Sequence, residues 1–315
     1  MNSSSDVNVS SSYINRDSAS TAVAKNVIVV ALGIIINYIN GTLIHTFRKH
    51  QIFCVNPRYI LFIHLVINDM IQLTTTISLF VYSYIFYKIN AFFCCLILIF
   101  AIFTTFNTPL NLAAMAMECY IAVCFPLRHS ELCTIKRTYI LIGCIWAMSA
   151  LSIFTDVFIA VATEPLRLIY ATVYCERDNL FRHSFSIQKR EISYVICLVV
   201  VWLSLFYSYF NIICAAKTAR VAKSTSGNMS NTRNTVLLHG FQLLLCMLNY
   251  VSHIMISAYV SWFPRHFRQV LFFHYITIQI FPRFISPIVY GLRDKTFKQY
   301  LKQYLVFTVS ARHKQ

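Results

Sequence analysis

Long apolar runs recur along this chain, and each could cross a membrane as a helix. A helix of about 20 residues spans roughly 30 Å of hydrocarbon. The 315 residues are 57% hydrophobic and 12% charged, about half the charge of an ordinary soluble domain. The runs do not alternate apolar and polar residues, and the six glycines supply little turn chemistry, so helices are expected rather than barrel strands. The sequence therefore predicts an all-α, multi-pass membrane protein.

The apolar runs divide the chain into three parts. Residues 1–23 are polar and rich in Ser and Asn, which predicts a disordered tail. Residues 24–292 hold the membrane-spanning bundle. Residues 293–315 are basic, with apolar residues at helical spacing, which predicts a short amphipathic helix on the membrane surface. We expect seven spans, at residues 24–47, 59–86, 91–124, 138–163, 192–216, 234–260 and 268–292.

Lysine and arginine predict the orientation of the bundle. They concentrate around residues 48–58, 128–137 and 217–233 and in the carboxyl-terminal tail, whereas acids partly offset the cations of the opposite loops. The positive-inside rule therefore places the first set in the cytoplasm and the amino terminus outside the cell. The formal net charge of +16 then reflects membrane topology. Membrane lipids are therefore the expected partner of the basic residues, and nucleic acid is not. In the outer tail, Asn2 and Asn8 each begin a glycosylation sequon.

Several polar and aromatic residues fall at characteristic positions of the predicted bundle. Asn40 and Asp69 are polar residues in the first two spans, and Trp146 lies in the fourth. The last span ends in Ser286-Pro287-Ile288-Val289-Tyr290, which is similar to an Asn-Pro-x-x-Tyr signature. Together with seven spans and an outer amino terminus, these features resemble the rhodopsin-like G-protein-coupled receptors.

Two further segments narrow the resemblance. "NPRYILFIHLVIND" keeps a twelve-residue interval from Pro57 to Asp69, and "MAMECYIAVCFPLRH" joins the third span to a basic loop. Both resemble segments of odorant receptors of the fish type, and the resemblance covers about residues 25–300. It implies that the protein binds a small odorant without a cofactor and activates the stimulatory olfactory G protein, raising cyclic AMP. It also implies a place in the plasma membrane of olfactory sensory neurons, and a disulfide between Cys94 and Cys175.

Glu118-Cys119-Tyr120 departs from the family pattern, which has an arginine at the position of Cys119. In the resembling receptors that arginine pairs with the neighbouring acid in the inactive state and contacts the G protein in the active state. Cysteine cannot replace a two-pronged guanidinium, so Glu118 has no adjacent cation here. Either the protein signals weakly or not at all, or, as we favour, it couples through its remaining inner surface. We expect that surface to include Glu118, Cys119, Tyr120, Pro126 and Tyr290.

Two charges, Asp69 and Arg283, lie inside predicted spans. A lone charge at the bilayer centre costs about 2.5–3.5 kcal/mol on insertion scales, so a partner is expected. The resemblance places both in one polar cluster with Asn40 and Ser286. We predict that Asp69 pairs with Arg283 and that no sodium ion is needed. The alternative is that Arg283 reaches the membrane surface or faces another helix.

We expect Asp156 to lie at the membrane interface. We expect the histidines of the spans to be hydrogen-bonded interior groups rather than metal ligands.

The expected ligand pocket opens in the outer half of the bundle. Residues at helical spacing share faces there on the third, sixth and seventh spans, although such stripes also form ordinary helix-packing surfaces. They are Leu98, Ala101, Ile102, Thr105, Tyr250, His253, Ser257, Tyr275 and Gln279. Ala101 lies where amine receptors keep an aspartate, so the ligand is expected to be small and weakly polar rather than an amine. The outer-loop cations, Arg177 and Lys189 among them, are nearly balanced by acids and are expected to be solvated.

Other function classes fit the sequence less well. An enzyme is not expected, because no phosphate-binding glycine loop, Gly-x-Ser-x-Gly or His-Glu-x-x-His motif occurs. A membrane transporter or channel is the alternative from another class, but the chain lacks an internal repeat and matching broken helices. A rhodopsin-like receptor for another small non-amine ligand stays open, because a fold does not fix a function.

Overall fold

The computed structural model describes most of the chain up to residue 221 and part of the remainder. The described residues are 18–86, 88–163, 171–173, 175, 177–181, 183–221, 252, 255–256, 258–259, 261–263, 266–285 and 299. The predicted tail with Asn2 and Asn8 lies outside them. So do nearly all of the predicted sixth span and of the ending 293–315.

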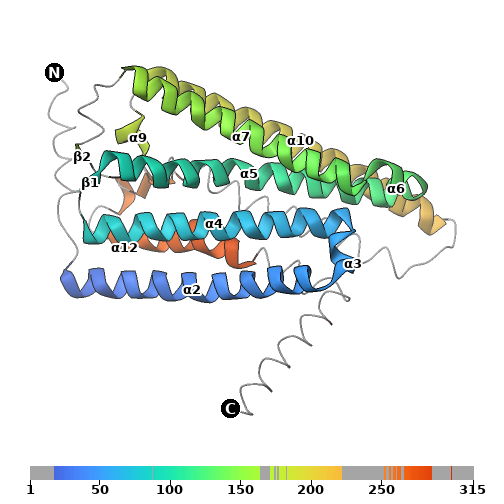
Figure 1. The fold of residues 1–315 in the computed structure, drawn as a ribbon, viewed down its shortest axis with the longest axis horizontal. Helices are drawn as coiled ribbons and strands as arrows, with labels where there is room; N and C mark the ends of the chain where they lie inside the picture. The colour runs from blue at the N-terminus through green and yellow to red at the C-terminus, as the bar shows by residue number, and fades with distance from the viewer. Residues whose placement is uncertain are drawn as a thin grey trace, which may run out of the picture.

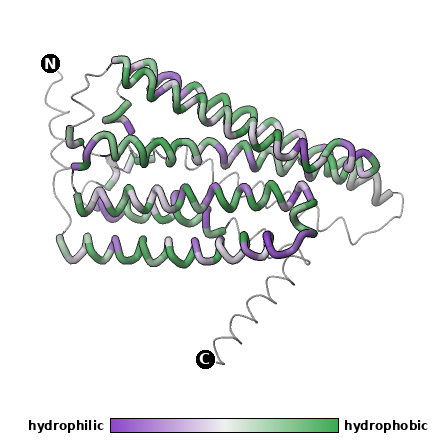
Figure 2. The backbone as a smooth tube through the Cα atoms, in the orientation of Figure 1, coloured by the Kyte–Doolittle hydropathy of each residue, from purple (hydrophilic) through white to green (hydrophobic). Residues whose placement is uncertain are grey.

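Five long helices run along the described bundle (Figure 1). They are α2 (Ala19–Lys49), α4 (Pro57–Ile85), α5 (Ala91–Cys124), α7 (Ile135–Thr163) and α10 (Ser184–Val221). All five are long and apolar enough to cross a membrane, which agrees with the first five predicted spans. Figure 2 shows hydrophobic residues along most of the length of each. Where the seventh span is predicted, α12 (Phe267–His274) continues as the π-helical η2 (Tyr275–Ile280).

Polar caps explain why the long helices begin where they do. The Ser18 hydroxyl accepts a hydrogen bond from the backbone N–H of Thr21 at the start of α2. Asn56 and Asn90 cap α4 and α5 in the same manner, because each side-chain oxygen accepts an N–H two residues later, at 3.1 and 2.9 Å. Such caps satisfy backbone donors that the first helical turn leaves without partners. Helices α2 and α4 therefore begin before the predicted spans at residues 24 and 59, whereas α5 begins at Ala91, where its span was predicted.

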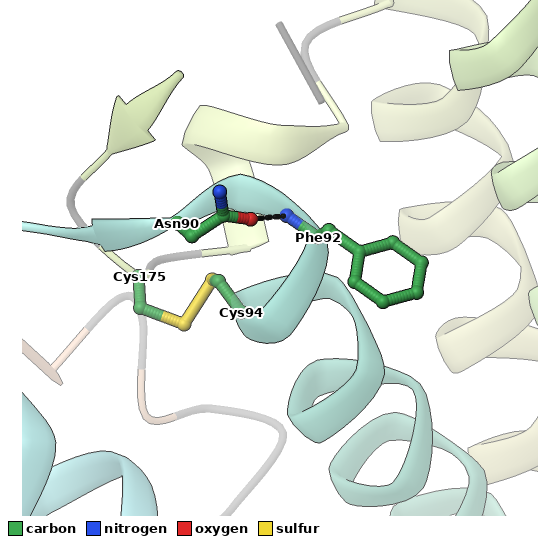
Figure 3. The surroundings of a disulfide bond; sticks show 4 residues. All are labelled: Asn90, Phe92, Cys94 and Cys175. Atoms are coloured by element: carbon green, nitrogen blue, oxygen red, sulfur yellow. Dashed lines mark hydrogen bonds between the residues drawn. A yellow bond between two sulfur atoms is a disulfide. The ribbon is translucent and has the colours of Figure 1, made fainter. Parts of the chain in front are cut away.

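Short elements gather at the two ends of the bundle (Figure 1). At one end β1 (Ile89–Asn90) pairs antiparallel with β2 (Thr172–Val173), close to α9 (Arg177–Leu180). The Cys94–Cys175 bridge lies beside them, so we name this the disulfide end (Figure 3). The opposite end carries α3 (Gln51–Cys54), η1 (Pro126–Arg128) and α6 (His129–Leu132). We name it the Glu118 end.

Helix α5 is central to the described bundle, since it packs against α4, α7 and α10. Side-chain hydrogen bonds join three of these helices in the interior. Trp146 on α7 donates its indole N–H to Nε2 of His64 on α4, at 2.5 Å. The Nδ1 atom of His64 therefore carries the ring hydrogen and donates to Oδ1 of Asn111 on α5, at 3.1 Å. Ser149 on α7 donates to Oδ1 of Asn107 on α5, at 2.6 Å. His64 is thus a hydrogen-bonded interior histidine, as predicted.

The outward faces of the long helices are apolar, the reverse of a water-soluble protein. Large hydrophobic side chains such as Ile34, Leu151, Phe158 and Phe210 are more than 60% exposed. The interior holds asparagines and threonines bonded between helices, for example Asn68 with Thr108 at 2.9 Å. Hydrocarbon around the bundle and polar bonds within it are the arrangement of a membrane protein.

Gly33 of α2 leaves the space that the Ile77 side chain of α4 fills. A Cβ atom built on Gly33 would lie 2.3 Å from Cδ1 of Ile77, whereas one on Gly143 of α7 meets nothing within 4 Å. We expect Gly33→Leu to lower the melting temperature of the purified protein and its surface expression, because overpacking costs about 1–3 kcal/mol. Gly143→Leu is the matched control and should leave both nearly unchanged. Equal losses in the two variants would contradict this packing.

Candidate functional site

Glu118 is a buried carboxylate with a cationic or imidazole partner on each oxygen. Its side chain is 5% exposed near the end of α5. Oε2 accepts from Nε of Arg58 at 3.2 Å. Oε1 lies 3.1 Å from Nε2 of His129. A buried carboxylate is stabilised when both oxygens are bonded in this way, and removing one partner is destabilising. Glu118 therefore ties α5 to α4 and to α6.

Arg58 and His129 each follow a short turn that contains a proline. Asn56 and Pro57 begin α4, which puts Arg58 in its first turn beside the last turns of α5. After α5 ends at Cys124, Pro126 starts the 3-10 turn η1, and His129 follows as the first residue of α6. Proline fits both positions because its fixed φ suits a first helical turn and it has no N–H to satisfy.

The sequence-based view of Glu118 was incomplete. No cation neighbours it in sequence, as expected, yet the fold brings Arg58 from 60 positions away and His129 from 11 positions away. In the sequence, Arg58 served only as one of the cations that predict membrane orientation. The signals that could have found both partners are their places directly after Pro57 and within "PLRH", since both motifs border the end of the third span.

Cys119 faces the interior of the bundle rather than the membrane. It is 4% exposed and packs against Ile212 of α10 and Tyr209, in a cluster that also contains Tyr120. The Tyr120 ring meets Tyr207 of α10 edge-on, and their hydroxyl oxygens are 3.3 Å apart. The sulfur at this position therefore fills space between α5 and α10, where the family pattern has a charged group.

The loop between α5 and α7 is closed by its own contacts. Nη1 of Arg137 donates to the backbone carbonyl of Glu131 at 2.7 Å. Burial raises the pKa of the Cys133 thiol, and the negative charge of Glu118 raises it further, while Arg137 lowers it. At neutral pH this thiol therefore stays protonated. Within this loop Pro126 is exposed, and the neighbouring Leu127 side chain is 93% exposed.

A second charged cluster occupies the disulfide end and corrects one expectation. Asp156 of α7 is buried within the protein, at 2% exposure, and its place at the membrane interface stays a prediction. Its Oδ1 lies 2.6 Å from Nζ of Lys189, and its Oδ2 lies 3.4 Å from Nη2 of Arg177. These two cations were expected to be solvated, but they are only 19% and 16% exposed. The carboxylate draws them out of water, and together they join α7, α9 and α10.

The disulfide predicted from the resemblance is confirmed. Cys94 and Cys175 are bonded, with their Cα atoms 5.4 Å apart (Figure 3). The bond attaches the segment after β2 to the first turn of α5, one turn beyond the Asn90 cap. It thereby positions α9, which carries Arg177, over the disulfide end.

The described members of the predicted polar cluster are all buried. Asn40 is 0% exposed, Asp69 2% and Arg283 4%. Arg283 therefore does not reach the membrane surface, and its Nη1 donates to the carbonyl of Ile278 at 3.0 Å. Its pairing with Asp69 stays a prediction, and Ser286 lies outside the described residues.

Most of the chain matches one protein family. The sequence profile described as 7 transmembrane receptor (rhodopsin family) covers residues 39–290. The chain belongs to this family. Its members are receptors that span the membrane seven times and activate G proteins. The five spans among the described residues are thus part of a seven-helix receptor.

Individual relatives agree with this assignment. The receptor is 30% identical to Odorant receptor 131-2 of zebrafish (Danio rerio) over 307 residues, which is 96% of this chain and 91% of the relative. It is 24% identical to Adenosine receptor A3 of sheep (Ovis aries) over 222 residues, 66% of this chain and 65% of the relative. With Adenosine receptor A3 of dog (Canis lupus familiaris) the identity is 22%, over 66% of each chain.

The predicted ligand-binding residues of the receptor lie in separate packing environments. Leu98 and Ile102 are buried among residues of α7 and α9. Thr105 accepts a hydrogen bond from Gln72 of α4 at 3.0 Å. Tyr275 stacks on Phe80 of α4, with ring centroids 4.7 Å apart. Ala101 is 9% exposed and Gln279 is half-buried. Their ligand-binding role stays a prediction. Further predicted residues of the ligand and G-protein sites lie outside the described residues, namely Tyr250, His253, Ser257 and Tyr290.

Proposed function

We propose that this receptor is an odorant-type receptor that binds a small, weakly polar odorant and activates the stimulatory olfactory G protein. The supporting observation is the likeness to Odorant receptor 131-2 along nearly the whole chain. In this proposal the disulfide end and the glycosylated tail face the outside of an olfactory sensory neuron. The Glu118 end faces the cytoplasm. The likeness to Adenosine receptor A3 supports a second candidate, a receptor for another small non-amine ligand.

The Glu118 contacts suggest how the receptor rests without the family arginine. Arg58 and His129 bond the two oxygens of one buried carboxylate, so they restrain the same acid that the arginine restrains in relatives. An odorant that binds the active bundle more tightly shifts a pre-existing two-state equilibrium. In this scheme, opening of the Glu118 end breaks one or both contacts and uncovers the inner surface for the G protein.

A functional assay tests the proposal. Cells expressing the wild type or Cys119→Arg at matched surface levels are exposed to a panel of water-soluble odorants, and cyclic AMP is measured. We expect the wild type to respond, because its resting restraint and inner surface do not depend on an arginine at position 119. A response by Cys119→Arg alone would mean that natural coupling is lost or routed elsewhere. Silence from both at full surface expression would contradict the odorant assignment, and a response to adenosine only would favour the second candidate.

Leu127 is the expected docking contact for the G protein. A leucine that is 93% exposed at the Glu118 end gains about 1.5–3 kcal/mol when a partner buries it. We therefore expect Leu127→Ala to lower receptor-stimulated nucleotide exchange on the purified G protein about tenfold. Because the side chain makes little contact within the receptor, surface expression should not change.

Leu151 provides the matched control for this prediction. It is 71% exposed on α7, within a predicted membrane span. Leu151→Ala removes the same atoms from a surface that lipid rather than a G protein covers, so exchange should stay at the wild-type rate. If Leu127→Ala also exchanges at the wild-type rate, the η1 segment is not part of the docking surface.

A further inference from the structure

Among the described residues, the cluster at the disulfide end carries one more positive than negative charge. Its three ionic side chains are Asp156, Arg177 and Lys189, and the single carboxylate contacts both cations. All three are largely buried, with exposed fractions of 2%, 16% and 19%. A charge withdrawn from water is costly unless an opposite charge compensates it. The described cluster therefore favours an additional anion.

Both cations retain hydrogen-bond donors after their observed contacts are made. Lys189 has three N–H groups, of which one donates to the carbonyl of Ser152 at 2.8 Å, and its ammonium forms an ion pair with Asp156 at 2.6 Å. Arg177 has five N–H groups, and its two terminal nitrogens contact Asp156 and the Tyr194 hydroxyl. At least one donor on each cation thus has no partner in the part of the chain that the structure describes, and it could bind a ligand oxygen. The remaining exposure of both side chains gives a small molecule access to them.

The side chains that pack beside the cations are apolar and mostly buried. The Arg177 guanidinium lies 5.7 Å from the centre of the Tyr194 ring, which in turn packs against Phe106 of α5 at 5.0 Å. Leu98 and Phe181 belong to the same packed cluster. A ligand that placed its anionic group on Arg177 and Lys189 would therefore lay an alkyl or aryl body against hydrophobic side chains.

We propose that Arg177 and Lys189 form an anion-binding subsite for a monocarboxylate with an apolar body. The carboxylate is the chemistry that matches a guanidinium fork beside an ammonium group, while Asp156 holds both cations in place. The inference deepens the proposed function, since it assigns a chemical class to the odorant, and it rests on that function. The inference concerns ligand binding only, so it can be tested without measuring signalling.

Thermal unfolding of the purified receptor in nanodiscs of uncharged lipid tests the subsite. The probes are hexanoate and two neutral analogues of similar size, hexanamide and hexanol, each at the same ionic strength. We expect hexanoate to raise the melting temperature of the wild type by about 3 °C or more at a tenfold excess over its Kd. Neither neutral analogue should do so, because neither supplies a charge to the cation pair.

Three variants assign the effect to the pair. Lys189→Gln removes the excess charge while Arg177 still pairs with Asp156, and it should abolish the hexanoate shift. Lys189→Arg keeps the charge and should keep the shift. Arg190→Gln removes a cation one residue further along α10, where the helix has turned by about 100°, and should also keep it.

The outcomes separate this inference from the proposed function. No hexanoate shift in the wild type would overturn the subsite. Equal shifts with hexanamide would also overturn it, since binding would then not depend on charge. Neither result bears on G-protein activation. Conversely, if the cyclic AMP assay failed but hexanoate still raised the melting temperature, the subsite would be supported. The receptor would then signal through another pathway.

Discussion

We expect the replacement of Glu118 with glutamine to raise ligand-independent signalling of the receptor about tenfold. The carboxylate accepts from Arg58 at 3.2 Å and lies 3.1 Å from Nε2 of His129. In the proposed resting state both contacts hold the Glu118 end closed. Hydrogen bonds to charged groups contribute about 1.5–3 kcal/mol, and solvent weakens the contact to Arg58, which is 40% exposed. A net loss of about 1.4 kcal/mol from the resting state changes the two-state ratio tenfold. The increase is measured as basal cyclic AMP in cells that express the variant and the wild type at matched surface levels.

Glu131→Gln is the control for this charge removal. Glu131 is an exposed acid in α6 at the same end of the receptor, thirteen positions from Glu118. Its neutralisation changes the net charge by the same amount without touching the buried contacts, so basal signalling should not rise. A rise of similar size in both variants would show that surface charge rather than the buried carboxylate restrains the receptor.

Cys94→Ser is expected to destabilise the receptor more than any other single change considered for the disulfide end. The disulfide joins residues 81 positions apart and fastens the β2–α9 segment to α5. On chain entropy alone a loop of this length contributes about 4–5 kcal/mol. Surface expression and the melting temperature should both fall sharply, and the proposed monocarboxylate subsite should be lost with them because α9 carries Arg177.

The adjacent thiol supplies a control of the same chemistry. Cys95 is free and half-buried, one residue along α5 from Cys94. Cys95→Ser should leave expression nearly unchanged, whereas Cys175→Ser and the double variant Cys94→Ser/Cys175→Ser should each match Cys94→Ser. A Cys175→Ser receptor that reached the surface at wild-type levels would mean that the bond is dispensable.

Hydrophobic patterning was sufficient to predict the helices, because span length is dictated by the thickness of hydrocarbon. The first five spans agree in position with α2, α4, α5, α7 and α10. Some helix ends were less predictable, since the caps Ser18 and Asn56 lie outside the apolar runs and start α2 and α4 earlier than predicted. The disulfide pairing came from family resemblance, because spacing alone does not specify which of eleven cysteines pair.

Charge partners were the least predictable feature. Arg58 and Glu118 are 60 positions apart, and their contact depends on how α4 packs against α5. Likewise, the loop charge of Arg177 and Lys189 looked balanced along the sequence, but in three dimensions both cations converge on Asp156. Such contacts follow from tertiary packing, and no local periodicity encodes them.

A double-mutant cycle on basal signalling tests the central claim most directly, namely that Arg58 and Glu118 act as one restraint on the resting receptor. Arg58→Gln, Glu118→Gln and the double variant are compared with the wild type at matched surface expression. We predict that each single variant signals more than the wild type and that the double variant signals no more than Glu118→Gln alone, because both changes break the same contact. Additive increases, or no increase in any variant, would contradict the account.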